Sequence, residues 1–475
     1  MGIVTVAWMF GSVWMNLTAG APITQFAKGL GASEFQFGVL SALPFIASLF
    51  SLPASLLTER TGARKRIFQW GLYSQRFMWI PLAIVPLLLV QHYGQPASEP
   101  AMLVFLAFVL LMHAGQSIGG PAWVSWMADL VPDRARGKYF SRRRQWGIVT
   151  AIPAAILVGV VMDRWAHLSA ADPTSHVNVL HVCAIVFLVA CLFGVVDIFM
   201  FHWVPAIHKE PQRGLHLFHA LAEPLRNRSF LWFAGMIATL VFAVSFMGQF
   251  VILHLIRRVG VTNTEVQLIT LVTPMLAQLI VLPAWGRAAD RMGKKPLLAI
   301  AGLGLVGPAV LWCFVTPQHL WIAYVASALG AATWTGVEIA NFNLVLELSA
   351  SKGEGPDKKP TGGSAYFAMN SIIINVAGLV GGLTSGVVAQ RLEHWTWQPL
   401  ATMRAIGAYD VLFILSAVLR LAAVVVFLPY IHEPTARGTR EALRFMTANI
   451  YNNLYNAVLQ PLRFVGSRLE SYRNP

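Results

Sequence analysis

Long apolar segments recur along the whole chain and restrict the surroundings in which it can fold. At roughly 18–25 residues each, they are long enough for a helix to cross a hydrocarbon core of about 30 Å. Lipid offers backbone groups no hydrogen-bonding partner, so segments of this length cross it as helices. Only 12% of the 475 residues are charged, against about 25% in soluble domains. The sequence therefore predicts an all-α integral membrane protein.

Twelve transmembrane helices can be placed in the sequence. They cover residues 3–24, 35–57, 67–91, 101–128, 145–163, 178–203, 229–256, 266–286, 297–316, 319–346, 366–389 and 406–430. A polar stretch at 204–228 separates the first six from the last six. We expect two six-helix bundles, over 1–203 and 229–434, joined by a cytoplasmic linker at 204–228. The tail, 435–475, has the apolar spacing of an amphipathic helix that lies on the membrane surface.

Matching features at matching positions indicate that the two halves are a repeat. The fifth span ends Gly-Val-Val-Met-Asp-Arg at 159–164, and the eleventh ends Gly-Val-Val-Ala-Gln-Arg at 386–391. Tyr-Phe also stands at the opening of both spans, at Tyr139 and Tyr366. Small residues recur every four positions in both spans, which lets helix backbones approach closely in lipid. We expect a parallel repeat of six spans, with these small-residue faces either in ordinary packing or in a sliding contact between the halves.

Positive charge is distributed unevenly among the loops. Most of the 35 Lys and Arg residues lie in one alternate set of loops and in the tail, at 60–66, 134–144, 209–228, 287–295, 352–359 and 437–473. By the positive-inside rule, these loops and both termini face the cytoplasm. The net charge of +14 thus lies in loops that face the anionic lipid of the inner leaflet. We therefore expect no nucleic-acid partner. We expect a monomeric, multi-pass protein of the inner or plasma membrane.

A short basic loop occurs once in each half, between the second and third spans of that half. Its residues are Glu59, Arg60, Gly62 and Arg64 in the first copy and Gly286, Asp290, Arg291, Gly293 and Lys294 in the second. A carboxylate at a helix start accepts backbone N–H bonds and meets the positive end of the helix dipole. An arginine beside it can form a forked pair with another carboxylate. The duplicated turn indicates a duplicated helical bundle in a membrane.

These features resemble the major facilitator superfamily, whose loop between spans 2 and 3 reads Gly-x-x-x-Asp-(Arg/Lys)-x-Gly-(Arg/Lys)-(Arg/Lys). The second copy matches this pattern well. The first has Ser55 and Glu59 in place of Gly and Asp, and Ala63 before its basic residues. Arg136 and Gly137 are similar to the family's Pro-x-x-x-Arg-Gly turn between spans 4 and 5. The resemblance covers essentially the whole chain before the tail and implies a transporter.

The resemblance also implies a conformational latch on the cytoplasmic face. In the family, the loop acid interacts with the start of span 11, and the loop arginine pairs with an acid that ends span 4. Here Glu59 and Arg60 would take those parts, with Asp129 as the partner. The mirror set in the second half is Asp290, Arg291 and Glu347. With the loop glycines and Arg136, these residues would hold the cytoplasmic face shut in the outward-open state, or would only anchor loops and set topology.

Ionisable groups inside a span cost about 2.5–3.5 kcal/mol on insertion scales, so each needs a reason. The family resemblance implies that spans 1, 4, 7 and 10 line a central cavity. Glu338 in span 10 is the strongest candidate for a solute or proton site, because a carboxyl group there is suited to reversible proton uptake. The alternative is a buried acid paired with a neighbour. Further polar candidates are His113, Gln116, Asn16, Gln249 and Asn341.

Other notable residues are expected to be structural. Arg76, Asp197 and Arg420 lie in spans 3, 6 and 12, which are peripheral in the family's fold. Residues 142–144 are three arginines that we interpret as solvated charge at the inner face. Three tryptophans are candidates either for stacking on a ring-shaped solute or for packing: Trp123, Trp126 and Trp334.

We therefore predict a secondary active transporter that moves a small polar solute, such as a sugar or an organic acid, by alternating access. Proton symport through Glu338 is a hypothesis. The chain has no Walker A motif and no catalytic constellation, so we expect no enzyme activity. His216 and His219 have no further ligands nearby in sequence, so we expect no metal or cofactor. The alternatives are a proton-driven exporter of the multidrug type and a transporter-like sensor or assembly protein.

Overall fold

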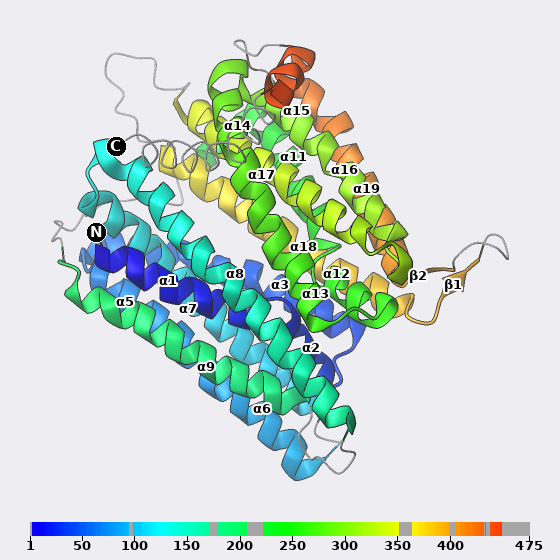
Figure 1. Cartoon of the computed structure of the whole chain (residues 1–475). Coiled ribbons are helices and arrows are strands. Elements are labelled where there is room, and N and C mark those ends of the chain that lie inside the picture. The colour runs from blue at the N-terminus through cyan, green and yellow to red at the C-terminus, as the bar shows by residue number, and fades with distance from the viewer. Residues whose placement is uncertain are drawn as a thin grey trace, which may run out of the picture.

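The computed structural model of the chain is built almost entirely of helices (Figure 1). The structure describes residues 2–94, 98–171, 179–206, 222–350, 363–398, 405–431, 433 and 438–448. Most of the predicted linker, with His216 and His219, lies outside the described residues. The tail is described only over 438–448, so its predicted amphipathic helix stays a prediction beyond that point.

The first half contains six helical spans, several of them broken into two. Their elements are α1 (Gly2–Thr18) with α2 (Ala21–Gly29), α3 (Glu34–Ser48) with α4 (Ser51–Thr61), α5 (Arg64–Phe77) with α6 (Trp79–Tyr93), α7 (Ser98–Leu130), α8 (Asp133–Ala171), and α9 (Val179–Met200) with η2 (Phe201–Trp203). The first span breaks at Gly20, whose φ of +74° disfavours any residue with a side chain. Gly20 also lies where an added Cβ would meet the side chain of Gln267 from the other half.

The second half repeats this arrangement. Its elements are α11 (Arg228–Ser245) with α12 (Phe250–Leu253) and η3 (His254–Val259), α13 (Asn263–Gln267) with η4 (Leu268–Val272) and α14 (Thr273–Met292), α15 (Lys294–Gly304) with α16 (Val306–Leu311) and η5 (Trp312–Phe314), η6 (Pro317–His319), α17 (Trp321–Ala350), α18 (Gly363–Arg391), and α19 (Ala408–Phe427) with η7 (Leu428–Tyr430). A two-stranded antiparallel sheet, β1 (Thr396–Trp397) and β2 (Ile406–Gly407), lies in the loop before α19, where we expected no strand.

The predicted membrane fold is confirmed. Eleven helical spans among the described residues are long and apolar enough to cross a membrane. The remaining predicted span, the tenth in chain order, is α17. It is as long as the others but less apolar, because Trp334, Thr335 and Glu338 occupy its middle. In Figure 1 the elements α1 to α9 form one lobe and α11 to α19 the other.

The second and eighth spans begin in the same way, as a parallel repeat predicts. Ser33 accepts a hydrogen bond from the backbone N–H of Gln36, and the Gln36 side chain accepts one from Ser33 N. Thr262 and Glu265 form the same capping box at the start of α13. Such a box satisfies two of the backbone donors that every helix start leaves free.

The hydrophobic core is continuous at one end of the molecule and divided at the other. One cluster spans both halves and includes Phe37 and Phe105 from the first and Phe250 and Phe413 from the second. The opposite end, where α1 begins, has a separate cluster in each half. We call these the joined end and the divided end. Close apolar packing therefore holds the halves together at the joined end.

Candidate functional site

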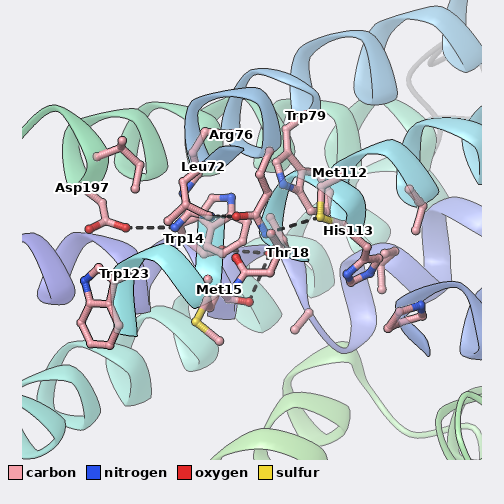
Figure 2. A pocket seen from close by; sticks show the side chains of 18 of the residues that line it. Trp14, Met15, Thr18, Leu72, Arg76, Trp79, Met112, His113, Trp123 and Asp197 are labelled. Carbon is pink, nitrogen blue, oxygen red and sulfur yellow. Dashed lines mark hydrogen bonds and ion pairs between the residues drawn. The ribbon is translucent and has the colours of Figure 1, made fainter. Parts of the chain in front are cut away.

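A cavity of about 640 Å³ lies in the first half, and Gln249 borders it from the second half. This volume is within the range of roughly 300–1,000 Å³ that is usual for small-molecule sites. Its wall is made by α1, α3, α5, α7, α8 and α9, so every span of the first half contributes to it. Figure 2 shows part of this wall, with Trp14, Arg76, Trp79, His113 and Asp197 along it.

A buried ion pair forms part of the wall. Arg76 Nη2 lies 2.9 Å from Asp197 Oδ2, and Arg76 Nη1 donates to Gln75 Oε1 at 2.6 Å. The Arg76 guanidinium also lies over the Trp14 ring, 3.5 Å from its centroid. An alanine at Gly194 of α9 would collide with Arg76 and Trp14, so the glycine makes room for this stack. We expected Arg76 and Asp197 to be peripheral; the structure instead places both in the cavity wall, because α5 and α9 close its side.

A second guanidinium reaches the same cavity from α8. Arg143 lies between two indole rings, with its Cζ 4.3 Å from the Trp8 centroid and 4.7 Å from the Trp123 centroid. Cation–π contacts of this kind favour a guanidinium over the ring face. Arg142 and Arg144 are exposed, as expected, but interpreting Arg143 as solvated charge was wrong, because its position on the helix turns it inward.

Three of the predicted polar residues line this cavity. They are His113, Gln116 and Gln249. Gln249 Oε1 accepts a hydrogen bond from Thr24 Oγ1 at 3.0 Å, so this residue links the two halves. Trp123 also lies in the wall, whereas Trp126 is fully buried and donates to the Pro205 carbonyl at 3.2 Å. Trp126 therefore packs and is not available to a solute.

The other predicted polar residues lie elsewhere. Asn16 is buried and donates to the Ser12 carbonyl at 2.8 Å within α1. Glu338 is exposed on α17 and accepts from Trp334 Nε1 at 2.9 Å. Asn341 Oδ1 accepts from Asn370 Nδ2 at 3.2 Å. The expectation of a buried acid paired with a neighbour does not describe Glu338, because its side chain is exposed.

A second, smaller cavity of about 380 Å³ lies in the second half. Trp334 and Arg420 are in its wall, and Gly20 of the first half borders both cavities. Arg420 Nη1 donates to the Leu305 carbonyl at 2.8 Å. Arg420 is buried and lines a cavity, so its expected peripheral position was wrong as well.

The two copies of the basic loop lie at the divided end. Gly62 has φ +62° and Gly293 has φ +89°, values that explain why both turns use glycine. Asp129 forms an ion pair with Arg64, which is buried, where we expected Arg60. Glu347 Oε2 lies 2.9 Å from Lys294 Nζ, where we expected Arg291. In both halves the ion pair therefore comes from a basic residue after the loop glycine.

The remaining loop residues make fewer contacts in this structure. Glu59, Arg60 and Asp290 are exposed, and an added Cβ on Gly286 would meet nothing within 4 Å. The Arg291 guanidinium lies 5.7 Å from the Phe445 ring centroid. The side chain of Arg136 lies outside the described residues.

Glu433 caps the start of α15, and sequence reasoning did not single it out. Its carboxylate accepts from the backbone N–H of Lys294 at 3.0 and 2.9 Å and from that of Lys295 at 2.6 Å. The acid of the basic loop, Asp290, is exposed and does not cap this helix. Only the approach of α19 to α15 brings Glu433 to this helix start, and no local signal in the sequence indicates it.

At the joined end, one carboxylate of the first half caps a helix of the second. Asp163 Oδ1 accepts from the backbone and side-chain nitrogens of Asn263 at 2.7 and 2.9 Å. Its Oδ2 accepts from the backbone nitrogen and hydroxyl of Thr264 at 2.9 and 2.6 Å. Gln390, at the equivalent position of the repeat, accepts from Phe35 N at 3.2 Å. The repeat therefore builds two helix-end contacts between the halves.

A second set of polar contacts closes the same end. Glu34 of the first half forms an ion pair with Arg257 and accepts a hydrogen bond from the Tyr409 hydroxyl at 2.9 Å. Glu34 is buried and both of its partners belong to the second half. The joined end is thus held by charge as well as by apolar packing.

Comparisons with known proteins agree with this architecture. A family model described as the Major Facilitator Superfamily matches residues 3–355 and 236–465. The chain is 29% identical over 136 residues to the "Proton-coupled folate transporter" of Bos taurus, a match that covers 27% of this chain and 27% of that protein. The match therefore spans only about a quarter of the length of that relative.

Solved structures share the fold over most of the chain. The nucleoside transporter NupG matches with 13% identity and a TM-score of 0.61, over 91% of this chain and 98% of that one. A bacterial homologue of the iron transporter ferroportin, in an inward-facing state, matches with 14% identity and a TM-score of 0.62, over 91% and 97%. A bacterial homologue of the human lysosomal transporter Spinster matches with 16% identity and a TM-score of 0.58, over 94% and 95%. At these identities the likeness shows the fold alone.

Proposed function

Since the chain belongs to the major facilitator superfamily, we propose that it is a secondary transporter that moves a small polar organic solute across the membrane by alternating access. The observation that carries this proposal is the asymmetry between the two ends of the molecule. The halves share one apolar core at the joined end and have separate cores at the divided end. The cavity of the first half, which Gln249 borders from the second, would then be reached from the divided end.

The basic loops indicate which side that is. Residues 60–66 and 287–295 lie at the divided end, and the positive-inside rule places such loops in the cytoplasm. We therefore interpret this conformation as inward-open, in a plasma or inner membrane. Three latch residues, Glu59, Arg60 and Asp290, are exposed here and would be free to meet the facing half. On closure of the divided end, we propose that the two loops contact the facing half and hold it.

The cavity wall supports a polar solute. Arg76, Asp197, His113 and Gln116 bring charge and hydrogen-bonding groups to one space. Glu338 does not line this space and is exposed on α17, so we propose that it takes part in proton coupling only when the divided end closes. The name of the Bos taurus relative, a proton-coupled transporter, is consistent with coupling of this kind.

A second candidate function is a proton-driven exporter of hydrophobic compounds. The observation that favours it is the apolar part of the wall, which includes Leu72, Trp79, Val109 and Met112. Such a surface would accept a hydrophobic compound through burial of apolar area. Direction of transport and solute polarity distinguish the two candidates.

The test is transport by the purified protein in proteoliposomes. Compounds that raise its thermal stability are selected first, because a ligand of the folded state stabilises that state. We expect a selected polar compound to accumulate when a pH gradient is imposed and to equilibrate without one. Glu338→Gln should abolish the gradient-driven part, whereas Glu99→Gln, at an exposed acid in the first turn of α7, should not.

Each result that contradicts the proposal has a distinct meaning. Full accumulation by the Glu338→Gln protein would exclude Glu338 as the coupling residue. Selective transport of hydrophobic cations would favour the exporter. Binding without transport of any selected compound would favour a sensor or assembly role.

A further inference from the structure

We propose that the cavity of the first half selects small organic anions, and that Arg143 binds their anionic group. This inference rests on the proposed transport function and specifies its solute. It follows from the charge balance of the wall, from the way in which Arg143 is held, and from the apolar surface around it.

The charges of the wall do not balance. Two guanidinium groups, Arg76 and Arg143, and one carboxylate, Asp197, line the cavity. Arg76 is paired with Asp197 at 2.9 Å and is thereby neutralised. Arg143 has no carboxylate within ion-pairing distance in the part of the chain that the structure describes. A charge in a low-dielectric site without a counter-ion is costly, so an anion that enters the cavity gains a ready partner.

Two indole rings surround the Arg143 guanidinium. The Arg143 Cζ lies over the Trp8 and Trp123 rings, 4.3 and 4.7 Å from their centroids. Neither ring carries a carboxylate or carbonyl acceptor, so the forked N–H groups of the guanidinium can still donate to a planar carboxylate. The buried Nε of Arg143 has no acceptor among the described residues. A lysine would supply charge without this fork.

The rest of the wall determines the body of the solute. Met15, Leu40 and Leu72 line the same cavity and offer no hydrogen-bonding groups. A volume of about 640 Å³ accommodates a ring system as well as a carboxylate. The favoured solute is therefore an anion with an apolar or aromatic body, and His113 and Gln116 are placed to contact a second polar group.

One alternative is a counter-ion that the protein itself supplies. Glu338 is an exposed carboxylate of the second half, and closure of the divided end would move α17 toward the first half. If Arg143 served only to pair with Glu338 in that state, removing either charge would alter the conformational equilibrium and leave the binding of an anion in the open state unchanged.

The experiment compares 2-naphthoate with its neutral counterpart 2-naphthamide, by calorimetric titration of the full-length protein in detergent. We expect the wild type to bind naphthoate at least about tenfold more tightly than naphthamide, as a charge-assisted hydrogen bond would give. Arg143→Gln should remove this preference, and Arg143→Lys should retain part of it. Arg142→Gln, an exposed arginine of the same helix, is the matched control and should bind like the wild type.

Two results would overturn the inference. One is equal affinity of the wild type for naphthoate and naphthamide, which requires no variant to fold. The other is undiminished binding of naphthoate by Arg143→Gln. If Glu338→Gln then altered the conformational equilibrium, Arg143 would serve as the partner of Glu338 and not as the anion site. Transport of neutral solutes alone would also overturn it and leave the proposed function intact. Binding of naphthoate without any transport would contradict the proposed function and leave this inference standing.

Discussion

At the scale of single residues, the pair Arg76 and Asp197 shows how a charge is maintained inside the bundle. Both side chains are almost fully buried, at 5% and 6% exposure, and each is the other's counter-ion. Removing one member of a buried pair leaves an uncompensated charge, whereas removing both leaves none. The Trp14 ring and the Gln75 side chain complete the surroundings of the guanidinium.

Single and double exchanges of this pair should therefore not be additive. We expect Arg76→Gln or Asp197→Asn alone to lower the free energy of unfolding by about 3–5 kcal/mol. The double variant should lose less than the sum of the two, as coupled neighbours do. Thermal and denaturant unfolding of the four proteins in detergent measures this. Additive losses would mean that the two charges do not depend on each other.

At the scale of whole elements, the small-residue face of α18 determines how closely the halves approach. Gly382 and Gly386 lie against Ala42 and Gly38 of α3, and Gly378 lies against the Phe45 ring. An added methyl group at Gly386 would collide with the α3 backbone. These small-residue faces therefore meet between the halves, where in lipid close backbone packing holds such helices together.

Gly386→Ala should separate α3 from α18 and destabilise the joined end. Gly307→Ala makes the same chemical change in α16 at a site where an added Cβ meets nothing within 4 Å. We expect the first variant to lower the unfolding temperature more than the second, because only the first places a methyl group against backbone of the other half. Equal effects of the two would show that the α3–α18 contact is not tightly packed.

At the scale of the whole molecule, the joined end must open if access is to alternate. Asp163 concentrates four hydrogen bonds between the halves on one carboxylate, and Glu34 adds an ion pair with Arg257. These contacts stabilise the present conformation over any in which the halves part at this end. Removing them shifts the equilibrium only by the free energy that they contribute to one state and not to the other.

Asp163→Ala should therefore increase the fraction of molecules that are closed at the divided end. Hydrogen bonds to a charged group contribute about 1.5–3 kcal/mol, so we expect a shift of at least about tenfold in the ratio of the two states. Spin labels at positions 66 and 226, both exposed at the divided end, report the change as a growing population of short distances. Asp163→Asn, which keeps one acceptor oxygen, should lie between. An unchanged distance distribution would show that Asp163 does not hold the joined end.

The sequence alone determined the twelve spans, the repeat and the position of the basic loops. The length of apolar segments, the alternation of basic loops and the glycine turns depend on neighbours in the chain and on the surrounding solvent. They can therefore be predicted from the sequence. It also placed His113, Gln116 and Gln249 on spans that reach the cavity.

Only the tertiary structure decided which side chains meet. Arg143 looked like one of three solvated arginines, and Arg76 and Asp197 looked peripheral, because the direction of a side chain depends on how its helix is rotated against others. The partners of Asp129 and Glu347 differ from the expected ones by a few positions within the same loop, a difference that turn geometry sets. Contacts such as Asp163 with Asn263 join residues that the sequence separates widely, and only packing of the two halves brings them together.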